Sequence, residues 1–336
     1  VEGLRAMGVV ESCQQRCHPK DRQDCTDIDG VETRSSSTSS WRSVCPDELQ
    51  ESTPCGSLVI CGLSTVQDSP ELFQWVPAKG WDSHARALKI SACNTCDWDG
   101  TGPIPTPAPG AAPWLLPCSD TVALRIAQRQ RALQSAGWKV ISSPPHIIQS
   151  LGDKAELPKY AARLGRLEML PRHFERPEKA SFPCILKPAQ GEFGKDACIC
   201  QSPGDVYDHA PNFSKNSWVL QELVPGDVEF SVSLLVSFGT ILDVVGMRYR
   251  YDREVYIWPG VVEVSKELVE VPVQHLQVLA SFVAEYDGIL NFNYKLRPDG
   301  RICIFEANTR IGADLACDAP RDRARQLFLM LDKIRG

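Results

Sequence analysis

Hydrophobic and polar positions recur with two different periods along the chain, and the changes of period predict helices and strands. Between Ser119 and Gly137, apolar residues recur at helical spacing behind a capping Ser-Asp pair, which predicts a helix that stops at the glycine. The next segment, "WKVIS" (138–142), predicts a strand. An earlier apolar run, 57–63, suits a buried strand. Strand and helix in alternation predict a small α/β domain that ends near residue 150.

The second half of the chain predicts several strands joined by turns. Residues 182–200 indicate a strand, a glycine turn and a strand, and residues 217–249 indicate two or three strands broken at Pro-Gly and Phe-Gly. A helix is expected on either side of Pro158, and an amphipathic helix over 271–288 ends at a glycine. The segment 289–308 predicts a hairpin turned by "RPDG".

Length and composition then set the domain organisation. The chain has 336 residues, of which 43% are hydrophobic and 23% charged, as in a soluble globular protein of two or three domains. Residues 1–56 are polar and irregular, which predicts a disordered or irregular extension. The α/β domain is placed at 57–150 and a larger domain at 151–336, with subdomains of about 151–216 and 217–336.

Charge and hydropathy exclude some classes of partner. A net charge of −6 argues against a broad nucleic-acid-binding surface, because a phosphate backbone rewards an excess of Lys and Arg. The sequence has no apolar run of about 18 residues and no signal-peptide pattern at its start, so neither a nucleic-acid nor a membrane partner is predicted. A cytoplasmic location is therefore expected. The first residue is Val1, which leaves open that the chain is a fragment.

The strand "ICIFEANTRIG" carries the clearest candidate chemistry. Its polar residues Glu306, Asn308 and Arg310 occupy alternate positions and share one face, because side chains alternate along a strand. The predicted hairpin folds Asn291 and Asn293 back beside them. Carboxylate and amide oxygens are the ligands that Mg²⁺ takes, with water and phosphate completing the shell. A solvated strand end is the alternative for Glu306 and Asn308 taken alone.

Two further segments suit a nucleotide. Lys187 closes an apolar strand and precedes a loop with Gly191 and Gly194, where backbone N–H groups can approach a phosphate. The stretch "VLQELVPGDVEFSV" embeds Glu222 and Glu229 among apolar residues, so it can hold a purine and its ribose. Taken alone, the first segment is equally a simple turn and the second an edge strand with exposed glutamates.

Together these segments resemble the ATP-grasp superfamily. Lys154 in "GDK", Lys187 with its glycine loop, the "QELVPGDVEFSV" hinge and "NFNYKLRPDGRICIFEANTRIG" occur in the family's order over about residues 152–314. The hinge and the E-x-N strand are most similar to the D-alanine–D-alanine ligase and carbamoyl-phosphate synthase branches. The resemblance implies an α/β (α+β) ATP-grasp fold, in which two α+β subdomains clamp ATP behind a small α/β pre-ATP-grasp domain.

The resemblance also implies roles for particular residues. Adenine is expected on the main chain of the hinge and ribose on one of its two glutamates, while lysines and the glycine loop contact the phosphates. This nucleotide set comprises Lys154, Lys187, Gly191, Gly194, Glu222, Leu223, Val224 and Glu229. The implied metal set comprises Glu306, Asn308 and Asn293. Arg310 and Lys187 are the implied catalytic residues, with Arg310 on a substrate carboxylate or a transferring phosphoryl group.

The implied activity is that of an ATP- and Mg²⁺-dependent ligase, with Mn²⁺ as a substitute metal. It would activate a small-molecule carboxylate as an acyl phosphate for attack by an amine or similar nucleophile. Asn293 departs from the family, which commonly has Asp or Gln at this position, and a neutral amide opposes less of the metal's charge. The alternatives are therefore an ATP-binding protein without turnover and a phosphotransferase to a hydroxyl. The two substrates and a homo-oligomeric state are left open.

Overall fold

The computed structural model describes the backbone of 58–61 and 93–96, and residues 98–107, 114–190, 194, 196–214, 217–258, 260–331 and 333–334. All of these belong to one compact unit, Cys55–Gly336. The predicted extension over 1–56 lies outside the described residues. No helix within the described ranges is long and apolar enough to cross a membrane.

The first elements form a small parallel sheet with two helices. The strands β1 (Leu58–Cys61), β2 (Cys93–Cys96) and β3 (Trp114–Pro117) pair in the order β2-β1-β3. Helix α5 (Asp120–Ser135) confirms the prediction and begins at Ser119, whose hydroxyl accepts from Val122 N at 3.3 Å. Helix α6 (Pro145–Gly152) follows and was not predicted.

The strand predicted over 138–142 is wrong. Only Lys139 forms a β-bridge, to Trp114, and the following residues run as coil toward the prolines Pro144 and Pro145. Pro144 and Pro145 have no N–H to donate to a sheet ladder, and Pro145 already begins α6. An apolar pattern of five residues was too short to outweigh those two prolines.

A second, small antiparallel sheet follows helix α7 (Leu157–Arg163). Pro158 lies in the first turn of α7, so the helix does not continue on its N-terminal side as predicted; a first-turn proline lacks only an N–H that would be unpaired anyway. The sheet contains β4 (Cys184–Pro188), β5 (Cys198–Cys200) and β6 (Trp218–Glu222) in the order β5-β4-β6. Helix α8 (Pro203–His209) connects β5 to β6.

The large sheet has five antiparallel strands in the order β11-β10-β7-β8-β9. They are β7 (Val228–Ser237), β8 (Thr240–Tyr251), β9 (Glu263–Val269), β10 (Gly288–Leu296) and β11 (Ile302–Asn308). The predicted hairpin over 289–308 is confirmed as β10 and β11. Helix α9 (Val273–Phe282) confirms the core of the amphipathic helix, although it ends earlier than predicted. A short π-helix (Asp314–Asp318) and α10 (Arg321–Leu331) follow.

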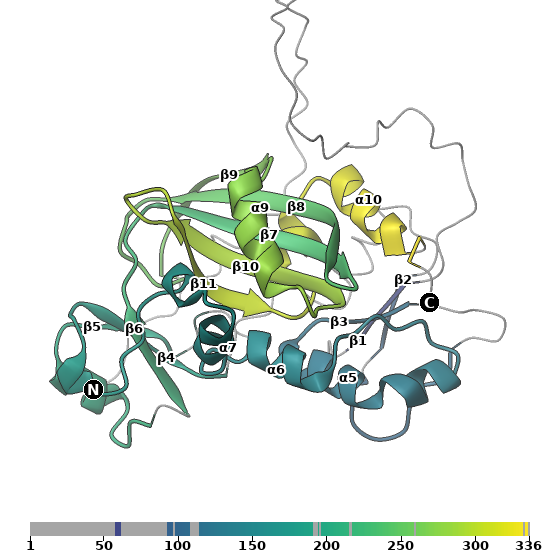
Figure 1. Ribbon diagram of the computed structural model, residues 1–336, viewed down its shortest axis with the longest axis horizontal. Coiled ribbons are helices and arrows are strands. Elements are labelled where there is room, and N and C mark those ends of the chain that lie inside the picture. The colour runs from purple at the N-terminus through teal and green to yellow at the C-terminus, as the bar shows by residue number, and fades with distance from the viewer. Residues whose placement is uncertain are drawn as a thin grey trace, which may run out of the picture. The chain divides into compact units, whose positions relative to one another are not determined.

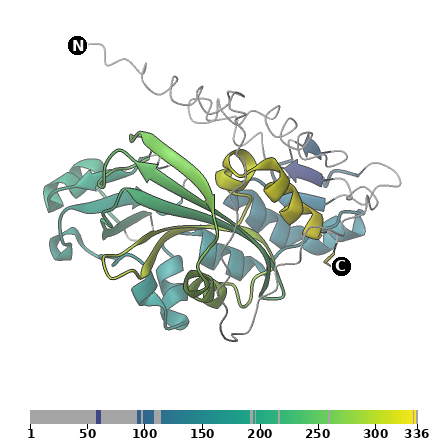
Figure 2. The same ribbon diagram turned by 90° about the horizontal axis from the view of Figure 1, so that it is seen from above.

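The two faces of the large sheet have different partners, as Figures 1 and 2 show with α9 and α10 on opposite sides. On one face, Phe292 of β10 packs with Leu279 and Phe282 of α9. On the other face, Met247 of β8 packs with Phe328 of α10. Because side chains alternate, the second face is also the one onto which β10 directs its polar residues. The sheet thus positions its candidate chemistry away from α9.

Candidate functional site

A cluster of three charged side chains lies between the small and large sheets. The Lys154 ammonium is 3.0 Å from Glu306 Oε1, and the Lys187 ammonium donates to the Phe305 carbonyl oxygen at 3.0 Å. Lys154 follows α6, Lys187 ends β4 and Glu306 is on β11, so three separate elements bring these groups together. The cluster brings two cations close to one partly buried carboxylate.

The ionisation of the cluster follows from its burial and its neighbours. Burial and repulsion from Lys154 lower the pKa of Lys187 to about 8. Burial alone would raise the pKa of Glu306, but the Lys154 and Lys187 ammonium groups outweigh it and lower that pKa to about 2. Glu306 is therefore ionised at neutral pH. The surplus positive charge of the pair suits a polyanion such as a phosphate chain.

The amides of the predicted metal set flank Glu306. Asn293 Nδ2 donates to Glu306 Oε2 at 3.2 Å across the β10–β11 pair, where the two residues are in register. Asn308 Nδ2 donates to Asn291 Oδ1, and Asn308 Oδ1 accepts from Arg310 Nη2, both at 3.2 Å. The described residues contain no group of three or more His, Cys, Asp or Glu side chains able to hold a metal. Any cation here would use one carboxylate and amide oxygens.

A buried polar chain fixes the orientation of these amides. Asn291 Nδ2 donates to Ser231 Oγ at 2.8 Å, and Ser233 Oγ donates to Asp314 Oδ2 at 2.9 Å. Burial raises the pKa of Asp314 to about 6, although its hydrogen bonds oppose the rise. None of these groups except Asn291 was singled out from the sequence. These hydrogen bonds hold the Asn308 amide against Asn291 of the neighbouring strand β10.

Asp120 connects the preceding α/β region to the strand end, and sequence reasoning missed it. The backbone N–H and the hydroxyl of Thr309 donate to Asp120 Oδ1 at 2.5 and 2.8 Å. Asp120 Oδ2 lies 3.8 Å from Arg310 Nε. The only signal in the sequence was its place in the first turn of a predicted helix. Asp is favoured there in any case, because its negative charge complements the helix dipole. Asp120 fixes the backbone immediately after the E-x-N strand.

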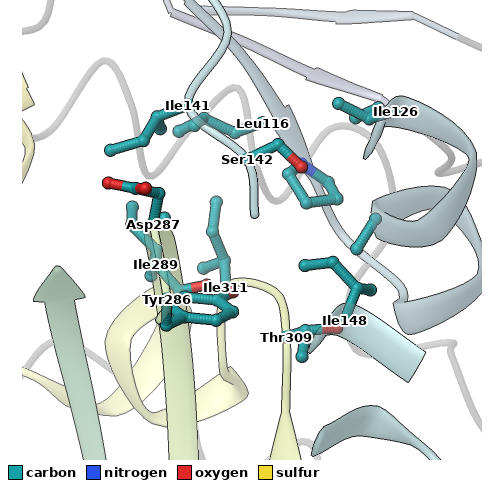
Figure 3. Close-up of a pocket in the computed structure, with 13 residues that line it drawn as sticks. Leu116, Ile126, Ile141, Ser142, Ile148, Tyr286, Asp287, Ile289, Thr309 and Ile311 are labelled. Atoms are coloured by element: carbon teal, nitrogen blue, oxygen red, sulfur yellow. Dashed lines mark hydrogen bonds between the residues drawn. The ribbon is translucent and has the colours of Figure 1, made fainter. Parts of the chain in front are cut away.

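Apolar side chains surround this connection. A small pocket there is lined mainly by side chains of β3, the 141–148 segment and the strand ends, and Figure 3 shows Thr309 beside Ile148. Tyr286, just before β10, and Ile289, near its start, line it from the large sheet. The Asp120 side chain is 23% exposed, so its hydrogen bonds to Thr309 are shielded from water only in part.

For the ATP-dependent reaction that the sequence resemblance implies, replacing Asp120 with Asn is expected to lower the turnover number by about 10- to 100-fold with little change in KM for the nucleotide. The Arg310 guanidinium would lose a neighbouring charge, and misplacement of a catalytic group by about 1 Å costs this much. Steady-state kinetics would separate the two parameters. Asp322→Asn is the matched control, because Asp322 is an exposed acid in the first turn of α10. An equal fall in both variants would contradict this positioning role.

The two glutamates of the hinge have different surroundings. Glu222 receives two hydrogen bonds from Arg297, at 2.7 and 2.9 Å, and one from the Arg172 backbone N–H at 2.9 Å. It pairs in register with Cys184, whereas Lys187 pairs with Val219, so Glu222 and Lys187 point to opposite faces of the small sheet. This geometry favours Glu229 over Glu222 as the glutamate that faces a ligand.

Glu229 lies at the other end of the polar face. Its Oε2 accepts from the Tyr256 hydroxyl at 2.9 Å. Burial raises the pKa of Glu229 to about 7, and the nearby Lys295 ammonium opposes the rise. Neither Tyr256 nor Lys295 was identified as a site residue from the sequence. Of the hinge main chain, the Val224 carbonyl contacts Lys295 at 3.5 Å.

The glycine loop after β4 is described only in part. Gly191 lies outside the described residues. Gly194 has a φ of +66°, and a Cβ added there would be 2.2 Å from the Trp258 carbonyl oxygen. A side chain at this position would therefore separate the loop from the segment around Trp258. The structure thus requires glycine at Gly194 for both its conformation and its close approach.

For the same implied reaction, Gly194→Ala is expected to raise KM for the nucleotide about tenfold or more, because a Cβ would push Gly194 away from the Trp258 carbonyl. Gly165→Ala is a matched control for backbone strain. Gly165 has a φ of +64°, and a Cβ added there meets nothing within 4 Å. Equal effects of the two substitutions on KM would contradict a role for the contact between Gly194 and Trp258.

His173 also borders this region and was missed. It forms a β-bridge with Gln221, which places its side chain on the face of β6 that Lys187 shares. Burial and the Lys187 charge lower the pKa of His173 to about 4, so the ring is neutral at physiological pH. Within the described residues, its buried Nδ1 has no hydrogen-bond partner. Only its position between two arginine-rich segments marks it in the sequence.

Comparison with known proteins identifies the fold. No protein-family model and no curated protein matches the chain. D-alanine–D-alanine ligase from Bacillus anthracis matches with a TM-score of 0.53 at 13% identity, over 84% of this chain and 97% of the ligase. Carboxyaminoimidazole ribonucleotide synthase from Aspergillus clavatus, solved with ATP, matches with a TM-score of 0.52 at 12% identity, over 82% and 77%.

A part of a larger enzyme matches as well. Pyruvate carboxylase from Rhizobium etli has a TM-score of 0.51 at 15% identity, over 84% of this chain and 29% of the carboxylase. The antiparallel sheets with flanking helices define a two-sheet α+β clamp, and the matching structures are ATP-grasp enzymes. The chain has the ATP-grasp fold, as the sequence predicted. The domain boundaries and the pre-ATP-grasp assignment of 57–150 stay predictions.

Proposed function

We propose that the protein is an ATP-dependent ligase that joins a small-molecule carboxylate to an amine. One observation carries the proposal. Lys154 and Lys187 lie close to Glu306, and Glu306 accepts a hydrogen bond from Asn293 of the neighbouring strand in the large sheet. Two cations on one side and a carboxylate with amides on the other suit a triphosphate and its metal. The structural likeness to ligases that use small molecules supports the same class of reaction.

In this reaction, a carboxylate oxygen of the substrate attacks the γ-phosphorus of ATP, and the bond to the β,γ-bridging oxygen breaks to release ADP. The amine nitrogen then attacks the carbonyl carbon of the acyl phosphate, releasing inorganic phosphate and a proton as the amide forms. Lys154 and Lys187 hold the phosphate oxygens. Arg310, fixed by Asn308 and Asp120, presents its planar fork to the carboxylate or the transferring phosphoryl group.

A divalent cation fits this donor set only with help from the nucleotide. Glu306 is ionised and Asn308 Oδ1 faces Arg310, but Asn293 contributes an amide where a second carboxylate would add charge. Mg²⁺ takes one or two carboxylates and completes its shell with phosphate and water, so Glu306, Asn308 and Asn293 would hold it. When bound, it would neutralise charge that develops on the phosphate oxygens.

Hydroxylamine trapping tests this function. Hydroxylamine attacks an acyl phosphate at carbon and gives a stable hydroxamate with release of phosphate, whereas it leaves a phosphoester intact. A panel of carboxylates with ATP, Mg²⁺ and hydroxylamine should give a hydroxamate for at least one acid. A stable phosphoester with no hydroxamate would favour the phosphotransferase alternative instead.

Asn293→Asp separates a weak ligase from a protein that only binds ATP. A second carboxylate should tighten Mg²⁺ and raise turnover about tenfold if the site is catalytic. Asn212→Asp is the matched control, because Asn212 is an exposed asparagine in the connection between α8 and β6. If Asn293→Asp stays inert with every acid while ATP still binds, the binding-protein alternative gains.

A further inference from the structure

A bidentate ion pair joins the small sheet to the hairpin of the large sheet. Arg297, in the turn between β10 and β11, donates from Nη1 to Glu222 Oε1 at 2.7 Å and from Nη2 to Glu222 Oε2 at 2.9 Å. Arg297 Nη2 also donates to the Leu170 carbonyl at 3.2 Å, and the Arg172 backbone N–H donates to Glu222 Oε2 at 2.9 Å. The side chains of Arg297 and Glu222 are 19% and 32% exposed, so water reaches the pair only in part.

Neither side chain of this pair faces the candidate site. Glu222 points to the face of the small sheet opposite Lys187, as the pairing of β6 with β4 shows. Arg297 lies four positions after Asn293, beyond the end of β10. A nucleotide held by Lys154 and Lys187 therefore need not touch the pair. Any effect of the pair on nucleotide binding has to pass through the backbone of the two sheets.

A second contact joins the same two parts of the fold. The Lys187 ammonium, at the end of β4, donates to the Phe305 carbonyl oxygen of β11 at 3.0 Å. Glu222 is in register with Cys184, three residues before Lys187, so the two contacts lie about 10 Å apart along the strand. One contact alone leaves the small sheet free to pivot, whereas two separated contacts fix its angle to the hairpin. The ion pair thus restricts how Lys187 approaches Glu306.

The guanidinium of Arg297 makes this connection directional. Its planar fork matches both oxygens of a carboxylate, so two parallel hydrogen bonds fix the orientation as well as the distance. A lysine ammonium at the same place would keep the attraction but not the orientation. The Arg297 hydrogen bonds hold the pKa of Glu222 below its usual value, although burial opposes this effect, so the carboxylate is ionised at neutral pH. A phosphate competes with the Phe305 carbonyl for Lys187, whereas the ion pair keeps its bonds.

We propose that Arg297 and Glu222 are positioning residues, which hold the small sheet at the angle that places Lys187 on the nucleotide phosphates. This role rests on the proposed nucleotide site and adds to it two residues that do not touch the nucleotide. The ion pair should therefore affect nucleotide binding only through Lys187. Substitutions about 10 Å apart without a shared partner normally have additive effects, so a strong dependence of one on the other is a specific sign of positioning.

Calorimetric titrations with ATP in two backgrounds test this role. With Mg²⁺ present, Arg297→Lys in the otherwise wild-type chain should raise the dissociation constant of ATP about fivefold, because the charge stays but the orientation is lost. In the Lys187→Met background, the same substitution should change that constant by less than about twofold, because the ammonium that it misplaces is already absent. Glu222→Gln should repeat both results. Arg301→Lys is the matched control, because Arg301 belongs to the same hairpin and pairs with Asp299 at the surface.

The outcomes separate this role from the proposed function. If wild type does not bind ATP, the proposed function fails and the positioning role fails with it. If wild type binds ATP and Arg297→Lys binds it equally well, only the positioning role is overturned. Equal weakening by Arg297→Lys in both backgrounds would also overturn it, because the ion pair would then act independently of Lys187. Should Arg297→Lys not fold, Glu222→Gln, which keeps the size of the side chain, decides by the same comparison.

Discussion

Lys187→Met is expected to weaken the binding of a nucleoside triphosphate by roughly 10- to 100-fold. A hydrogen bond to a charged group contributes about 1.5–3 kcal/mol, and Lys187 is the cation at the centre of the cluster. Methionine keeps most of the volume, and removing a buried cation that Lys154 repels should not destabilise the fold. Isothermal titration calorimetry on folded variant and wild type would measure the change.

The pH dependence gives the same prediction a second readout. Because the pKa of Lys187 is lowered to about 8, the free protein loses this positive charge as the pH rises through that value. Wild-type affinity should therefore fall above pH 8, and Lys187→Met should flatten that part of the profile. Lys159→Met is the control, because Lys159 is an exposed lysine paired with Glu156. If Lys187→Met binds the nucleoside triphosphate as tightly as wild type, Lys187 does not contact the nucleotide.

Glu306→Gln is expected to abolish the dependence of binding on Mg²⁺ and to lower turnover by about 1000-fold or more. Glu306 is the single carboxylate in the predicted metal set, and three powers of ten correspond to about 4 kcal/mol of barrier. Without metal, the substitution should instead strengthen the binding of the triphosphate. Removing the negative charge leaves Lys154 and Lys187 uncompensated, so metal-free triphosphate should bind more tightly than it does to wild type.

Titrations with and without EDTA would show both effects of Glu306→Gln. Glu267→Gln is the matched control, because Glu267 is an exposed glutamate of the large sheet that pairs with Arg248. A variant in which Mg²⁺ still strengthens binding as in wild type would show that the metal is held elsewhere. A variant with weaker metal-free binding would contradict the charge balance assigned to the cluster.

The sequence was sufficient wherever a local pattern dictated the structure. The alternation in "FEANTR" places Glu306 and Asn308 on one face, and the "RPDG" turn sets the pairing of Leu296 with Ile302 at the start of the hairpin. Ser119 before a helical run was enough to predict the start of α5. These features depend on neighbours within a few residues, which is why they could be predicted without the fold.

Contacts between distant segments could not be predicted in the same way. Asp120 and Thr309 are 189 positions apart, and nothing local to either residue indicates their hydrogen bonds. The hinge sequence could not show which of Glu222 and Glu229 faces the ribose. Only the pairing of β6 with β4 and the position of Arg297 show which face Glu222 occupies. Lys295 resembled any charged residue near a hairpin until its contacts with Gly226 and Tyr256 were known.

The most direct test of the account is thermal stabilisation of the purified chain by ATP, with and without Mg²⁺, in wild type and Lys187→Met. A ligand that binds only the folded state raises the unfolding temperature by mass action, so no substrate need be known. The account predicts a Mg²⁺-enhanced rise with ATP that Lys187→Met largely abolishes. No rise with ATP at millimolar concentration, or an equal rise in both proteins, would contradict a nucleotide site at Lys154, Lys187 and Glu306.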